Sequence, residues 1–181
     1  MDFMYETDRL ILKVLDVSYA HDILLWYSKN RFDFDQYEPK RSDKFYTEEF
    51  HYRLLELENE YMLKGEMYRF YAFFKNDPNT ILGTISIRNI SRGPYQSCEI
   101  GYKVDTKFRR MGIGHEMVKK TCDLVFDDLD LHRIEATCLP WNKPSYTLLE
   151  KIGFEREGLM RKCCEINGQY EDLYLYSLIN E

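Results

Sequence analysis

The segment Arg109–Gly114, Arg-Arg-Met-Gly-Ile-Gly, has the composition of an anion-binding loop. It lies between a strand-like segment at residues 98–104 and a helix-like segment at residues 112–128. The first turn of a helix carries N–H groups without intrahelical acceptors and the positive end of the helix dipole. The two glycines leave room for a phosphate at this backbone, and the two arginines add positive charge at its rim. The segment therefore predicts a phosphate site at a helix N-terminus.

Two other phosphate-binding motifs do not fit these residues. The dinucleotide fingerprint has three glycines in the first βαβ unit, whereas only two glycines are present here and no such unit precedes them. A Walker loop requires Gly-Lys-Ser/Thr, but His115 follows Gly114. A plain strand-to-helix connection remains the alternative, because paired glycines occur in many loops.

The elements that position this segment follow from hydrophobic periodicity and turn residues, in the order β-α-α-β-β-β-α-β-α-β-β. This order is typical of an α+β (α/β layered) domain with a central mixed sheet. Asn167-Gly168 predicts a type I′ turn between the last two strands. Strands are expected at residues 10–15, 68–75, 81–88, 98–104, 133–139, 154–166 and 170–179, and helices at about residues 17–27, 47–65, 112–128 and 144–152. The second helix is expected to bury Phe50, Leu54, Leu57 and Tyr61.

The composition limits the class of protein. The chain has 181 residues, which suits one domain over residues 1–181. The net charge of -6 argues against nucleic acid as a partner, because that binding depends on clustered Lys and Arg. Without a signal peptide or a long apolar stretch, we expect a cytoplasmic protein with no membrane partner. The five cysteines lack metal-ligand spacing, so we expect no metal and reduced, buried thiols at Cys98, Cys122, Cys138, Cys163 and Cys164.

Further motifs surround the phosphate segment. Glu99-Ile100-Gly101-Tyr102 precedes it, and Asn142-Lys143-Pro144-Ser145 and the run from Leu148 to Gly158 follow it. This series resembles the GNAT superfamily of N-acetyltransferases, and more closely its ribosomal-protein-alanine (RimJ/RimL-type) branch. Residues 6–12 and 166–172 also resemble that branch. The resemblance covers nearly the whole chain and is weakest over residues 30–66.

The resemblance implies a single GNAT-like domain whose central sheet is mixed, mostly antiparallel and flanked by helices. It implies acetyl-CoA as co-substrate, held between two parallel strands that splay apart at residues 98–104 and 133–139. The pantetheine arm would lie along the backbone of Tyr102, Lys103 and Val104. The expected pyrophosphate and side-chain contacts are Arg109, Arg110, Met111, Gly112, Ile113, Gly114, Asn142 and Ser145.

Acetyl transfer to an amine proceeds by direct attack on the thioester and needs no covalent enzyme intermediate. Proximity contributes at best about 7–11 kcal/mol. A free α-amine has a pKa near ~8 and is largely protonated at neutral pH, so a base assists the attack.

Two residues are candidates for the proton transfers. In the branch that the chain resembles, a Glu at the place of Glu99 acts as the base; alternatively, Glu99 pairs with a neighbouring cation or anchors the amine. Ser145 is the candidate acid for the departing sulfur, with a helix cap as the alternative. Many superfamily members place a tyrosine acid seven residues after the Asn, but this chain has Leu149 there.

The leading functional hypothesis is an acetyl-CoA-dependent N-acetyltransferase acting on a primary amine, in particular a protein or peptide N-terminus. The alternatives are an acetyltransferase for a small amine (a polyamine, an amino acid or an aminoglycoside) and a non-catalytic CoA-binding module. The acidic loop Asp33–Glu38 is a candidate receiver for a cationic acceptor, with a solvated loop as the alternative. We expect a monomer, or a homodimer formed through the final hairpin.

Overall fold

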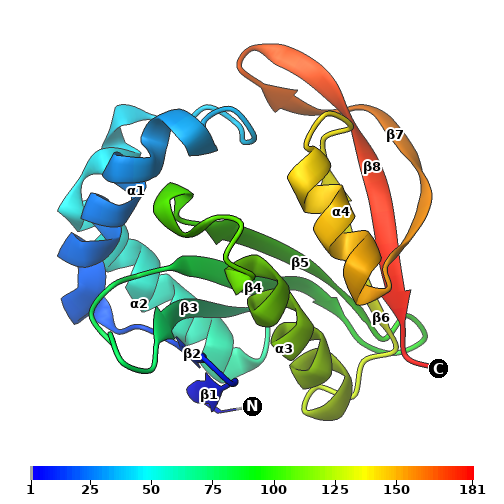
Figure 1. Ribbon diagram of the computed structural model, residues 1–181, viewed down its shortest axis with the longest axis horizontal. Helices are drawn as coiled ribbons and strands as arrows, with labels where there is room; N and C mark the ends of the chain where they lie inside the picture. Colours follow the sequence, from blue (N-terminus) through cyan, green and yellow to red (C-terminus); the bar gives the residue numbers. More distant parts are fainter. Residues whose placement is uncertain (1) are drawn as a thin grey trace.

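A computed structural model describes residues 2–181. Its centre is an eight-stranded mixed sheet in the order β1-β2-β3-β4-β5-β6-β8-β7, in which β5 and β6 run parallel and the other neighbours run antiparallel (Figure 1). The strands are β1 Met4–Glu6, β2 Leu10–Lys13, β3 Tyr68–Phe74, β4 Gly83–Ser91, β5 Ser97–Val104, β6 Arg133–Cys138, β7 Glu155–Ile166 and β8 Gln169–Ile179. The helices are α1 Ala20–Phe34, α2 Glu48–Lys64, α3 Ile113–Asp127 and α4 Lys143–Ile152, with short 3-10 turns η1 Val17–Tyr19, η2 Asp43–Tyr46 and η3 Thr106–Phe108. The expected fold class is confirmed.

Local sequence signals set several element boundaries. The Thr47 side chain accepts a hydrogen bond from the Phe50 N–H and begins α2, and Gly65 ends this helix with a left-handed φ of 73°. At the last hairpin, Asn167 and Gly168 have φ angles of 52° and 79°. Positive φ at both positions is the signature of the type I′ turn that the sequence predicts.

Two hydrophobic cores lie on the two faces of the sheet. One core joins α3 and α4 to strand residues that include Phe70 and Ile100, and the other joins α1 and α2 to Tyr71 and Phe73. Figure 1 shows α3 and α4 on the near face of the sheet. Since successive strand residues alternate between faces, Glu99, Gly101 and Lys103 point away from α3 and α4.

The buried face of α2 differs from the expected one. Phe50 and Leu57 are 37% and 43% exposed. The buried residues lie one position further along the chain and are His51, Leu55, Glu58 and Met62. The prediction was wrong because two of these four are polar, so an apolar count favours the neighbouring stripe. Glu58 is buried because it pairs at 2.6 Å with Arg69 of β3.

The first strand, β1, was not expected. It has three residues and pairs with β2 from Met4↔Lys13 to Glu6↔Ile11. Such a short run is too brief to show a periodicity. The remaining strands and all four α-helices occur in the predicted order.

All five cysteines are free thiols. Cys98, Cys122 and Cys138 are buried, as expected, whereas Cys163 is exposed and Cys164 is half-buried. Both lie on β7 near an irregularity in its pairing with β8, which opens the strand there. Within residues 2–181, no helix has the length and apolar character needed to cross a bilayer.

His51 predicts an acid sensitivity of the fold. It is 0% exposed and stacks on Tyr27. Burial, and then the charge of Arg41, lower its pKa from 6.5 to about 4. Below pH 6.5, His51 therefore binds a proton in the unfolded chain but not in the folded chain. Stability is lost as the pH falls from 6.5 towards 4. The difference between the two pKa values corresponds to about 3 kcal/mol in the free energy of unfolding.

We expect the His51→Phe variant to lack this pH-dependent loss of stability, so that its melting temperature falls less than that of the wild type between pH 7 and pH 4.5. Calorimetry or circular dichroism across this range measures the two slopes. The exposed His21, changed to Ala, is the matched control and should keep the wild-type slope. An unaltered slope in His51→Phe would contradict the assignment.

Candidate active site

A gap opens in the sheet between β5 and β6. The two strands pair only at Ser97↔Arg133, Cys98↔Ile134 and Glu99↔Glu135, although β5 continues to Val104 and β6 to Cys138. The sheet thus contains the expected parallel pair that splays apart. Backbone groups along residues 100–104 lack a strand partner on this side and are available to a ligand.

The loop from β5 to α3 lies beside the gap and carries the expected phosphate segment. Arg110 and Gly112 adopt left-handed conformations, with φ of 63° and 80°. Gly112 precedes α3, and no side chain caps the helix. The first-turn N–H groups of α3 are therefore free to bind an anion.

Gly114 has a packing role that the sequence did not predict. A Cβ at this position would lie 2.9 Å from Leu148 Cδ1 and 3.4 Å from Val104 Cγ2. The residue therefore allows α3 to pack closely against α4 and β5. This packing brings the start of α3 to the edge of the gap.

A clamp from the N-terminal strands holds the start of α3. Glu116 accepts hydrogen bonds from the Arg9 backbone N–H at 2.9 Å and Arg9 Nε at 2.7 Å, and from Thr7 Oγ1. Arg9 Nη1 also donates to the Met111 carbonyl at 3.0 Å. Burial raises the pKa of Glu116, but the Thr7 and Arg9 hydrogen bonds outweigh it and hold this pKa below its usual value. The ionised Glu116 thus fixes the loop from one side.

Helix α1 holds the same loop from the other side. Asp105 is 0% exposed and accepts hydrogen bonds from Lys29 Nζ at 2.9 Å and Asn30 Nδ2 at 3.0 Å. The Asn30 side-chain oxygen in turn accepts the Thr106 N–H at 3.0 Å. Sequence reasoning did not identify either this contact or the Glu116 clamp, because their partners lie 75 or more residues apart.

The carboxylates of the acidic loop Asp33–Glu38 are paired with basic side chains of the protein. Asp33 pairs with Arg109 at 2.9 Å, and Glu38 pairs with Arg41 and, at 2.6 Å, with Lys103. Asp35, the third acid, lies 3.5 Å from Arg31. The pairings of Asp33 and Glu38, which tie the loop to the phosphate segment and to β5, were not predicted from the sequence.

Glu99 lies where β5 and β6 separate, on the face away from α3 and α4. Its Oε2 accepts a 3.3 Å hydrogen bond from Arg88 Nε, so the predicted alternative of a neighbouring cation is present. Glu135, the residue of β6 that pairs with Glu99, is held at 2.8 Å by Arg133, which also binds Glu157 through both terminal nitrogens. These Arg133 hydrogen bonds, followed by that of Ser177, lower the pKa of Glu157 to about 2.

Ser145 lies on the other face, within reach of Tyr102. Its Oγ is 2.9 Å from the Tyr102 hydroxyl, which joins β5 to α4 across the gap. Ser145 is not the helix cap, because Asn142 takes that position and its Oδ1 accepts the Ser145 N–H. Burial raises the pKa of Tyr102 well above 10, so the phenol keeps its proton. The pairing of the two hydroxyls was not predicted, although Tyr102 was expected on the buried face of its strand.

Other reactive side chains are less suited to the chemistry. Cys138 ends β6, and burial raises its thiol pKa to about 11 despite the nearby Ser145 hydroxyl. Leu149 is fully buried, so core packing takes the position where many relatives carry a tyrosine. His115 is exposed on α3. Across residues 2–181, no cluster of three or more His, Cys, Asp and Glu side chains could hold a metal ion.

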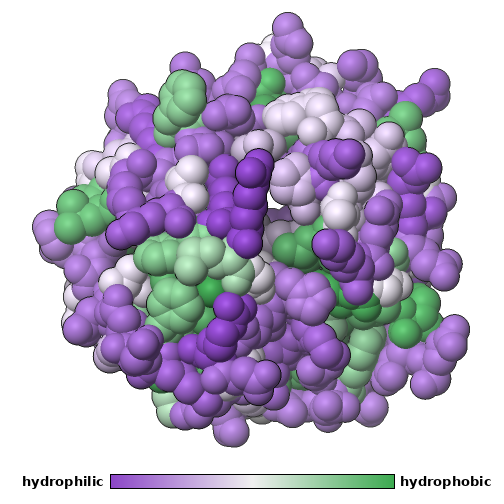
Figure 2. Space-filling view, viewed as in Figure 1, coloured by the Kyte–Doolittle hydropathy of each residue, from purple (hydrophilic) through white to green (hydrophobic). Residues whose placement is uncertain are grey.

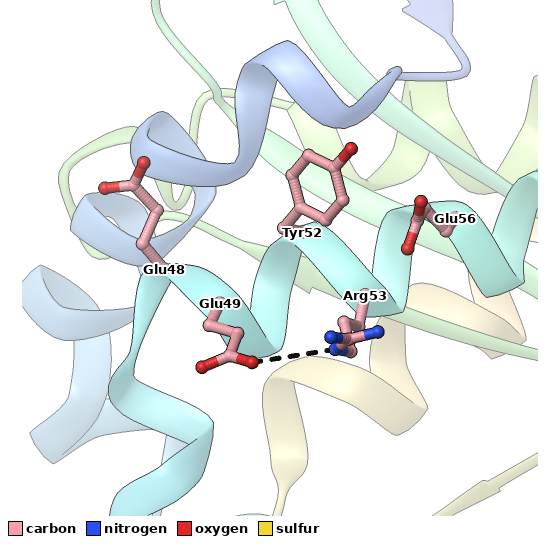
Figure 3. A pocket seen from close by; sticks show the side chains of 5 residues that line it. All are labelled: Glu48, Glu49, Tyr52, Arg53 and Glu56. Carbon is pink, nitrogen blue, oxygen red and sulfur yellow. Dashed lines mark ion pairs between the residues drawn. The ribbon is translucent and has the colours of Figure 1, made fainter.

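A hollow on the outside of α2 lies apart from these groups. Figure 3 shows its five lining residues, all from this one helix, with Arg53 paired to Glu49 at 3.7 Å. They occupy the exposed side of α2, away from the buried His51 and Leu55. The hollow therefore shares no side chain with the strand gap.

Comparison with known proteins identifies the family. Residues 9–155 match the family described as Acetyltransferase (GNAT) domain. The probable N-acetyltransferase YjcK of Bacillus subtilis (strain 168) is 36% identical over 177 residues, which cover 98% of this chain and 97% of that protein.

Solved structures agree with this result. The ribosomal-protein-S5-alanine acetyltransferase from Vibrio fischeri has a TM-score of 0.94 and 33% identity, covering 99% of this chain and 98% of that one. RimL, a ribosomal L7/L12 α-N-protein acetyltransferase solved with coenzyme A, has a TM-score of 0.87 at 21% identity, over 97% of both chains. The chain belongs to the GNAT family of acetyltransferases and is an acyltransferase.

Proposed function

We propose that this protein, acting as one catalytic domain over residues 1–181, transfers the acetyl group of acetyl-CoA to the α-amine of a protein or peptide N-terminus. The observation that carries the proposal is the gap between β5 and β6, with an uncapped helix N-terminus at its edge. Glu99 and the Ser145–Tyr102 pair lie on its two faces. The acceptor assignment is supported by the Vibrio fischeri relative, which is named for a ribosomal protein.

The donor fits the residues beside the gap. Its pyrophosphate would meet the first-turn amides of α3, where Gly112 presents no Cβ, and the exposed Arg110. The backbone of Tyr102, Lys103 and Val104 offers the free strand edge for the pantetheine arm. RimL, which shares this fold, was solved with coenzyme A.

The bound donor supplies an activated acetyl thioester, and Glu99 serves as the base for the incoming amine. Arg88 keeps its carboxylate oriented from β4, while the opposite carboxylate, Glu135, is held by Arg133. Glu99 is thus the carboxylate of the two with the longer and weaker pairing. It accepts the amine proton directly or through water.

Ser145 serves as the acid for the departing sulfur. Its hydroxyl gives its proton to sulfur and takes one from Tyr102, whose oxygen is 2.9 Å away, and the tyrosinate so formed regains its proton from solvent. Because burial raises the pKa of Tyr102, the phenol is protonated before the transfer and readily regains its proton afterwards. Asn142 sets the position of Ser145 by capping α4.

Gly112→Asp tests the phosphate site. A Cβ at this position would lie 3.1 Å from Arg9 Nη2, so the change places a carboxylate among the charges beside the phosphate segment and should raise the Kd for coenzyme A by about 100-fold, as measured by calorimetry. Gly93→Asp is the matched control, since Gly93 is also left-handed, at φ +70°, but lies in open space on another loop. Equal affinity in the two variants would rule out the site.

An acetyl-CoA turnover assay tests the acceptor class. We expect peptides with a free N-terminus to give a higher kcat/KM than polyamines, amino acids or aminoglycosides. A peptide whose N-terminus is blocked but which carries a lysine is the control. Faster turnover of a small amine would contradict the peptide assignment, and tight coenzyme A binding without any turnover would leave only a binding module.

Glu99→Gln tests the base. Its kcat should fall about 100-fold at pH 7, with little change in the KM for acetyl-CoA. The deficit should shrink above pH 9, because an α-amine with a pKa near ~8 is then already deprotonated. Glu135→Gln, the neighbouring carboxylate, should keep most of the activity. A deficit that is constant with pH would show that Glu99 only orients the acceptor.

A further inference from the structure

The side chain of Arg9 connects the N-terminal strands to the phosphate segment. Arg9 lies between β1 and β2. Its Nε and Nη2 bind Glu116 Oε2 of α3 at 2.7 and 2.6 Å, and its Nη1 donates to the Met111 carbonyl at 3.0 Å. All three nitrogens of the guanidinium thus have an acceptor within the protein. These contacts of Arg9 with Glu116 and Met111 are called the lock below.

The backbone of Arg9 is itself held by the sheet. Its carbonyl accepts a 3.0 Å hydrogen bond from the N–H of Lys75, the residue after β3, and its N–H donates to Glu116 Oε1 at 2.9 Å. Thr7 Oγ1 donates to the same carboxylate oxygen and accepts the Leu10 N–H at 2.9 Å. The lock therefore attaches the start of α3 to β2 and β3 through fixed backbone.

The bond to Met111 sets the direction of the next amide. In a trans peptide, the C=O of one residue and the N–H of the next point in opposite directions. Between residues 2 and 181 no peptide bond is cis. Since Arg9 holds the Met111 carbonyl, the Gly112 N–H points away from Arg9. Gly112 directly precedes α3, so this amide adjoins the first-turn amides that are proposed to bind the pyrophosphate.

The backbone of Gly112 does not fix this direction by itself. Gly112 has a φ of 80°, but glycine adopts negative φ about as readily as positive φ. The Met111–Gly112 peptide is therefore free to turn over unless another group holds it. Turning over would direct the Met111 carbonyl towards the anion and withdraw the Gly112 N–H. The bond from Arg9 opposes this change.

The lock acts through geometry more than through charge. The opposite charges of Arg9 and Glu116 cancel beside the anion. The Arg9 side chain is 48% exposed, and Figure 2 shows that the face with α3 and α4 is largely hydrophilic, with a narrow opening near its centre between the regions of β5 and α4. An ion pair that is open to solvent contributes little to overall stability. Removing Arg9 should therefore release the peptide without unfolding the protein.

We propose that Arg9 is a positioning residue for the donor, which holds the Met111 carbonyl so that the Gly112 N–H faces the pyrophosphate of acetyl-CoA. The inference rests on the proposed function and deepens it, because it gives the N-terminal strands a part in binding the donor. Arg9 acts on the phosphates through Gly112 and takes no part in the chemical step. Its loss should therefore weaken only donors that carry phosphate.

The test compares two acetyl donors with one peptide acceptor: acetyl-CoA, and S-acetylpantetheine, which has the same thioester arm but no phosphate. Arg9→Met should lower the ratio of kcat/KM for acetyl-CoA to that for S-acetylpantetheine by about tenfold, through the KM for acetyl-CoA. Partial loss of folded enzyme would reduce both values alike and leave the ratio unchanged. Arg9→Lys keeps the charge but lacks the planar fork, so it should also lower the ratio.

Glu6→Gln is the matched control, because Glu6 of β1 also forms an exposed ion pair, at 2.9 Å with Lys75, outside the phosphate segment. It should keep the wild-type ratio. A wild-type ratio in Arg9→Met or in Arg9→Lys, with turnover retained, would overturn the role of Arg9 alone. If the wild type acetylated no amine, the proposed function would fall. The Kd for coenzyme A, measured by calorimetry, would then decide the lock, since equal values in Arg9→Met and the wild type would overturn it.

Discussion

The separation of β5 from β6 is the constraint on which the rest of the structure depends. Two parallel strands that begin as partners at Ser97↔Arg133 would ordinarily continue to pair, since each unmade backbone hydrogen bond in a buried place is costly. Here each strand has another partner on its outer side, β4 for β5 and β8 for β6. These outer pairings hold the two strands on diverging courses, and the Tyr102–Ser145 contact spans the space between β5 and α4.

Buried and half-buried carboxylates hold the loop beside this gap in one conformation. Asp105 ties it to α1, and Glu116 ties the start of α3 to Arg9 and Thr7. Each carboxylate is satisfied by several donors, which is the condition under which a buried charge is tolerated. A binding site that is ordered before its ligand arrives loses less conformational freedom on binding. Six polar side chains outside the phosphate segment therefore hold it in place: Thr7, Arg9, Lys29, Asn30, Asp105 and Glu116.

Much of the fold follows from local patterns, and much of the site does not. Alternation along residues 98–104 places Tyr102 and Glu99 on opposite faces, and the Asn167-Gly168 turn fixes the last hairpin, because both signals depend on neighbouring residues. The buried face of α2 was missed because His51 and Glu58 are buried through partners on other elements. The pairing of Glu38 with Lys103 is equally non-local, so the sequence predicted the acidic loop but not its attachment to β5.

The division of the charged and hydroxyl groups between two faces has a chemical consequence. Glu99 lies with Arg88 near the carboxylate network of Arg133, whereas Ser145 and Tyr102 form an uncharged pair next to an apolar core. In the proposed mechanism, a proton removed from the amine on the first face is therefore not the proton that reaches sulfur on the second. In that mechanism the acid must carry its own proton at neutral pH, and the Ser145 hydroxyl beside a phenol that burial keeps protonated meets this requirement.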